Sequence, residues 1–62
     1  MSDHARDTLL RLLVSHQADI FAAADGDEAA VVRIAQTSLY SRDSVTMAAQ
    51  LLASQRSLME KR

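Results

Sequence analysis

The chain has 62 residues, no cysteine, two aromatic residues and a net charge of −1, with acidic and basic residues interspersed. This composition excludes disulfides and thiolate metal sites, offers no apolar run of the roughly 20 residues that cross a membrane, and lacks the concentrated positive charge that attracts nucleic acid. A chain this small forms a single domain, residues 1–62, that is marginally stable alone. We therefore expect it to associate with a second copy, with a dimer favoured.

A first helix is expected over about residues 3–24. Leu9, Leu13 and Ile20 recur at helical spacing, and Leu10 and Phe21 widen the apolar face to an arc of roughly 200°. One neighbouring helix cannot cover so wide an arc, so part of this face is expected to contact a partner. Gln17 falls inside the same face. It is expected either to pair with Gln55 or with a partner, and so to fix the register of the helices, or to reach water on a partly exposed face.

Asp25-Gly26-Asp27-Glu28 predicts the end of one helix and the start of the next. Gly26 is the only glycine and can take the left-handed conformation that closes a helix. Asp25 and Glu28 have the spacing of a capping box, and Asp27 is a second candidate cap. We expect a second helix over about 27–40, with an apolar stripe of Val31, Val32, Ile34, Ala35 and Leu39.

A third helix is expected over about 43–61, after a break at Ser41–Ser44. The apolar stripes before and after this break differ in phase by roughly 130° on one straight helix, which favours two helices over one. The sequence therefore predicts an all-α fold, a small helical hairpin or three-helix bundle completed by dimerisation. A two-helix hairpin with one long second arm is the alternative. Met47, Leu51 and Leu58 line one edge of the third helix, Met59 lies on its other edge, and Gln55 lies within its apolar face.

Residues 33–45 resemble the helix-turn-helix motif of DNA-binding proteins. The similarity lies in Ile34-Ala35, in Ser41-Arg42-Asp43-Ser44-Val45 and in Ala48, whereas Leu39 stands where the motif has its turn glycine. By that resemblance the chain would be a transcriptional regulator that uses residues 33–50. The motif would place these side chains against DNA: Arg42, Asp43, Ser44, Thr46, Met47 and Gln50.

No arrangement of residues predicts a reaction, a cofactor or a metal site. His16 is beside Ser15, but neighbours on a helix diverge by about 100°, so the two side chains are not expected to meet. The acidic residues around Gly26 lack the ligand spacing of a calcium loop and are explained by helix capping.

The function favoured by the sequence is therefore a small, cytoplasmic, non-enzymatic regulatory or adaptor protein. It would self-associate and bind a larger protein partner through its apolar helix faces, as inhibitors, antiactivators and chaperone-like subunits do. DNA binding through the motif above is the alternative. The candidate partner-binding residues are Leu10, Gln17, Phe21, Met47, Leu51, Gln55, Leu58 and Met59.

Overall fold

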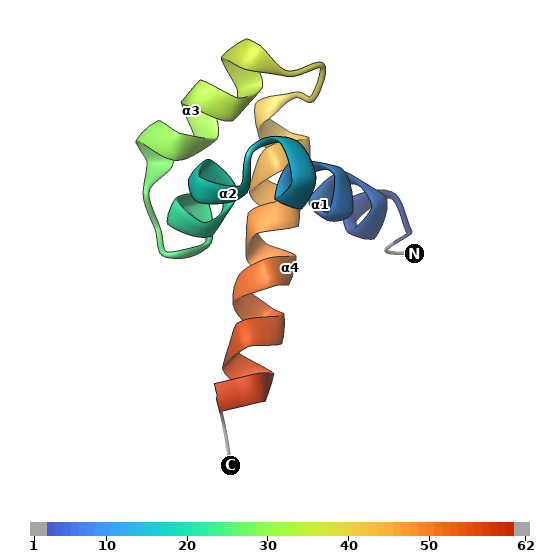
Figure 1. The fold of residues 1–62 in the computed structure, drawn as a ribbon, viewed down its shortest axis with the longest axis vertical. Coiled ribbons are helices and arrows are strands. Elements are labelled where there is room, and N and C mark those ends of the chain that lie inside the picture. Colours follow the sequence, from blue (N-terminus) through green and yellow to red (C-terminus); the bar gives the residue numbers. More distant parts are fainter. Residues whose placement is uncertain (1–2, 61–62) are drawn as a thin grey trace.

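A computed structural model describes residues 3–60, with side chains up to residue 58. These residues form four α-helices: α1 (Asp3–Ser15), α2 (Gln17–Ala24), α3 (Glu28–Thr37) and α4 (Arg42–Glu60). The first three helices pack around the N-terminal half of α4, and the C-terminal turns of α4 project beyond them (Figure 1). The all-α prediction is confirmed.

The expected first helix is divided at His16, which the sequence prediction missed. His16 has φ −136° and ψ 47°, outside the helical region. Its N–H still donates to the Leu12 carbonyl at 2.7 Å, and its carbonyl accepts the first bond of α2 from Ile20 N at 2.9 Å. The Ser15 hydroxyl donates to the Arg11 carbonyl at 2.9 Å, a side-chain bond that often bends helices. The bend lets α2 pack against both α3 and α4.

The predicted boundary at Gly26 is confirmed. Gly26 has φ 105°, and the Gly26 and Asp27 N–H groups donate to the Ala23 and Ala22 carbonyls at 3.0 and 3.1 Å. This pair of bonds is the Schellman arrangement that closes a helix end. Asp27 then caps α3, because its Oδ1 accepts the Ala29 N–H at 3.0 Å. The cap is therefore the second candidate, Asp27, and not Asp25.

A break is also present between α3 and α4, so the alternative of one long second arm is wrong. The chain leaves α3 after Thr37, and Ser41 caps α4 by accepting the Ser44 N–H at 3.2 Å. Leu39 consequently falls in the link, not on the α3 stripe, and its side chain is fully exposed. Tyr40, in the same link, packs against the core.

The core is built from all four helices and is rich in alanine. Leu9 and Leu12 of α1, Ile20 of α2, Ile34 of α3 and Val45 of α4 supply its larger side chains. Four alanines complete the set with Leu52, and their small size lets the helices approach closely: Ala23, Ala30, Ala48 and Ala49. Thr8 is also buried, and its hydroxyl donates to the His4 carbonyl at 2.8 Å.

Candidate partner-binding surfaces

An apolar stripe remains uncovered along α4. The α4 stripe consists of Met47, Leu51 and Leu58, which lie on one side of the helix. Met47 is 49% exposed and Leu58 is 71% exposed, whereas Leu51 is half-buried and touches the core. The stripe therefore starts at the edge of the core and continues onto the projecting end of α4, where Figure 1 shows no neighbouring helix.

Two of the predicted partner-binding residues with apolar side chains lie on the first two helices, outside the α4 stripe. Leu10 of α1 is well exposed. Phe21 of α2 is 37% exposed, and the Arg56 guanidinium lies over its ring at 5.9 Å from the centroid. Arg56 Nη1 also pairs with Asp25 Oδ1 at 2.8 Å, which holds the cation in place. Phe21 is thus half-covered by the chain itself.

Gln17 and Gln55 are both exposed. They form no hydrogen bond with each other, so an internal amide pair that fixes register is absent, and both amides are open to water. Their contact with a partner stays a prediction. The Met59 side chain lies outside the described side chains. Val14 is an exposed apolar residue of α1 that the sequence prediction left out of the candidate surface.

A groove of about 590 Å³ opens between the α2–α3 corner and the first half of α4. Its floor is made of buried or half-buried small side chains: Ala23, Ala24, Val31, Ala49 and Ala53. Its rim is made of exposed polar side chains: Asp27, Glu28, Arg42, Asp43, Thr46 and Gln50. The groove was not predicted, because it depends on how closely the corner approaches α4.

Of the six proposed DNA contacts, four line this groove: Arg42, Asp43, Thr46 and Gln50. Met47 belongs to the α4 stripe instead, and Ser44 is half-buried, with its Oγ accepting the Ser41 hydroxyl at 3.2 Å. Asp27 and Glu28 line the same groove, so a phosphate backbone entering there would meet carboxylates.

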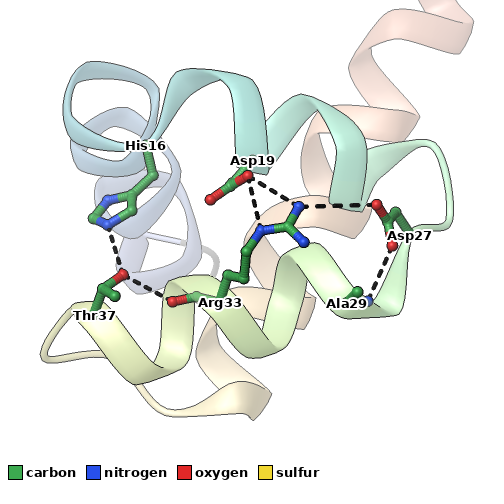
Figure 2. Close-up of polar contacts among 6 residues, drawn as sticks. All are labelled: His16, Asp19, Asp27, Ala29, Arg33 and Thr37. Carbon is green, nitrogen blue, oxygen red and sulfur yellow. Dashed lines mark hydrogen bonds and ion pairs between the residues drawn. The ribbon is translucent and has the colours of Figure 1, made fainter.

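Several cations that could neutralise phosphate are already paired within the described residues. Arg33 Nη2 lies 3.2 Å from Asp19 Oδ1 and 4.0 Å from Asp27 Oδ2 (Figure 2). Arg56 is held by Asp25, and Arg11 pairs with Asp7 at 3.1 Å. Exposed pairs of this kind stabilise weakly, by about 0–1 kcal/mol each, but they reduce the positive potential that the surface presents.

His16 does contact Ser15, contrary to the sequence prediction. Because the helix breaks at His16, Ser15 Oγ lies 2.9 Å from Nδ1 of the His16 ring. On the other side of the ring, Nε2 lies 3.1 Å from Thr37 Oγ1, as Figure 2 shows. The two hydroxyls donate to the Arg11 and Arg33 carbonyls, and a neutral imidazole has a single N–H, so the ring can donate to one of the two hydroxyls at a time. The ring therefore ties the α1–α2 bend to the end of α3, a structural role.

Residues 3–58 contain no group of three or more histidine, aspartate or glutamate side chains placed to hold a metal ion. Among the described helices, none is both long and apolar enough to cross a membrane. In comparisons with known proteins, no family model, curated protein or solved structure matches the chain.

Proposed function

We propose that this chain is a small, non-enzymatic regulatory or adaptor protein that self-associates and binds a larger protein partner through its apolar helix faces. It would act as an inhibitor, antiactivator or chaperone-like subunit. The observation that carries the proposal is the α4 stripe, where Met47 and Leu58 leave large apolar side chains in water. Clustered exposed apolar side chains are typical of binding surfaces, whereas single ones are ordinary.

The projecting end of α4 supports association through this helix. Short isolated helices are marginal in water and gain most of their stability from packing of an apolar face. Leu58 has no such packing within the described chain, although it lies on the same side as Leu51, which touches the core. A second α4 laid along the stripe would continue the core outward and cover Leu58.

The test is sedimentation equilibrium of the wild-type chain, Leu58→Asp and Ser57→Asp. The two variants place the same charge on adjacent exposed positions, but only Leu58 belongs to the stripe. We expect the wild type and Ser57→Asp to associate and Leu58→Asp to be monomeric, with equal helix content by circular dichroism. Association that is the same in all three proteins would refute the assignment of the stripe.

DNA binding is the second candidate. It is favoured by the order of α3, a short link at 38–41 and α4, which matches the helix-turn-helix arrangement in sequence. It is opposed by the carboxylates of Asp27 and Glu28 beside the proposed reading residues. Titration of a labelled generic duplex at low and high salt decides between the two. Binding that collapses with salt would favour DNA, and a flat titration would favour a protein partner.

A further inference from the structure

We propose that the groove between the α2–α3 corner and α4 is the binding site for a basic amphipathic helix of the partner protein. This inference rests on the proposed function and names the chemistry of its partner. The centre of the groove lies on a different side of α4 from the stripe, since Thr46 and Ala53 are about 100–140° around the helix from Met47 and Leu58. Self-association and partner binding therefore use separate surfaces of one helix.

The shape of the groove favours a peptide segment over a small molecule. Its volume of about 590 Å³ falls within the range of ligand sites, but it is only partly enclosed and opens to solvent. Sites for small molecules typically enclose 70–90% of the ligand surface, which an open groove does not do. An open groove can instead accept side chains from one face of a helix that lies across it.

The floor favours close approach of such a helix. Ala24, Ala49 and Ala53 present methyl groups from two sides, and Val31 adds an apolar wall. Small side chains let two helix backbones approach, so medium-sized apolar side chains of the incoming helix can reach the floor. Ala49 and Ala23 are already buried, which means that the bottom of the groove is the outer boundary of the core.

The rim sets the charge of the occupant. It carries three carboxylates, Asp27, Glu28 and Asp43, against one guanidinium, Arg42. Asp27 is partly engaged, because it caps α3 and lies 4.0 Å from Arg33. Glu28 and Asp43 make no ion pair with another residue of the described part, and both are exposed. Lysine or arginine side chains flanking an apolar face would be attracted to these two carboxylates, and acidic ones repelled.

The experiment uses two fluorescein-labelled helical peptides as probes. They share one leucine and alanine face and differ only in the flanking residues, which are lysine in one peptide and glutamate in the other. Fluorescence anisotropy measures binding of each to the full chain at low and high salt. We expect the lysine peptide to bind, the glutamate peptide to bind at least tenfold more weakly, and the difference to shrink as salt screens the rim.

Two variants of the groove test its location. Glu28→Gln combined with Asp43→Asn should weaken the lysine peptide by roughly fivefold, since two exposed pairs are lost. Ala53→Leu should block it by filling the floor. Asp7→Asn, which removes an equal carboxylate from α1, is the control and should leave binding unchanged. If Ala53→Leu unfolds, the double charge variant still decides, because its positions are exposed.

Equal binding of the two peptides would overturn the inference, as would binding that is unaffected by the double charge variant. Binding of a labelled duplex but of neither peptide would also overturn it, in favour of nucleic acid. The proposed function fails separately. If the wild type does not sediment as an oligomer but binds the lysine peptide, the stripe assignment is wrong. If it associates through Leu58 but binds no peptide, the groove assignment is wrong.

Discussion

Truncation of Leu58 to alanine measures the proposed association quantitatively. Burying a leucine side chain fully contributes about 1.5–3 kcal/mol. Leu58 is 71% exposed in the single chain, so covering its side chain in a dimer would contribute about 1–2 kcal/mol of association free energy from each copy. In a symmetric dimer both copies contribute, which makes the loss about 2–4 kcal/mol per dimer. The dissociation constant of the dimer should therefore increase by roughly 30-fold to several hundred-fold in Leu58→Ala.

Sedimentation equilibrium over a range of concentrations measures this change directly. The matched control is Leu39→Ala, since Leu39 is also a leucine and is fully exposed but lies in the link between α3 and α4. Its dissociation constant should stay within about twofold of the wild type. A thermal melt gives a second reading, because the melting temperature of an associating chain rises with concentration. Equal weakening by both variants, or a Leu58→Ala constant equal to wild type, would refute the reasoning.

Three further predictions concern the fold that presents these surfaces. Gly26→Ala should lower the free energy of unfolding in urea by about 1–2 kcal/mol, because the residue has φ 105°. No atom lies within 4 Å of an added Cβ, so the cost comes from backbone conformation alone. A larger loss in Gly26→Asn than in Gly26→Ala would contradict this explanation. Ile34→Ala should lower the free energy of unfolding by about 2–5 kcal/mol and Ile34→Val by about 0.5–1.5 kcal/mol, since the side chain is fully buried. Thermal melts followed by circular dichroism that rank the two variants in the opposite order would be inconsistent with this burial. His16→Ala and Thr37→Val should each lower the free energy of unfolding by about 0.5–1.5 kcal/mol. In a double-mutant cycle, the double variant should lose less than the sum of the two single losses. Full additivity would mean that the two side chains do not interact.

The features that could be predicted from sequence are those specified by local chemistry. Gly26 marks a helix boundary because a left-handed residue is needed there and no other glycine exists. The break before α4 follows from the change of phase between two apolar stripes and from the capping serine, Ser41. Exposure of Met47 and Leu58 follows from an apolar arc too wide for one neighbour.

The features that were missed depend on tertiary packing. The break at His16 has no glycine or proline signal, and the apolar pattern of residues 5–23 stays in phase across it. The break is instead specified by the contacts of α2 with α3 and α4, together with the Ser15 and Thr37 hydroxyls that contact the His16 imidazole. The groove is missed for the same reason, because its two walls are joined only when the α2–α3 corner is placed against α4.

The same helix, α4, carries both the stripe and one wall of the groove. Pairing two copies along α4 would therefore also fix the distance between the two identical binding grooves of the dimer. Such a dimer is bivalent without any flexible linker. A partner that offers two basic helices at the matching separation would gain avidity of up to about 10²–10⁴ over a single groove, and a partner with any other separation would gain none. The geometry of α4 would then select partners by the distance between their helices as well as by their charge.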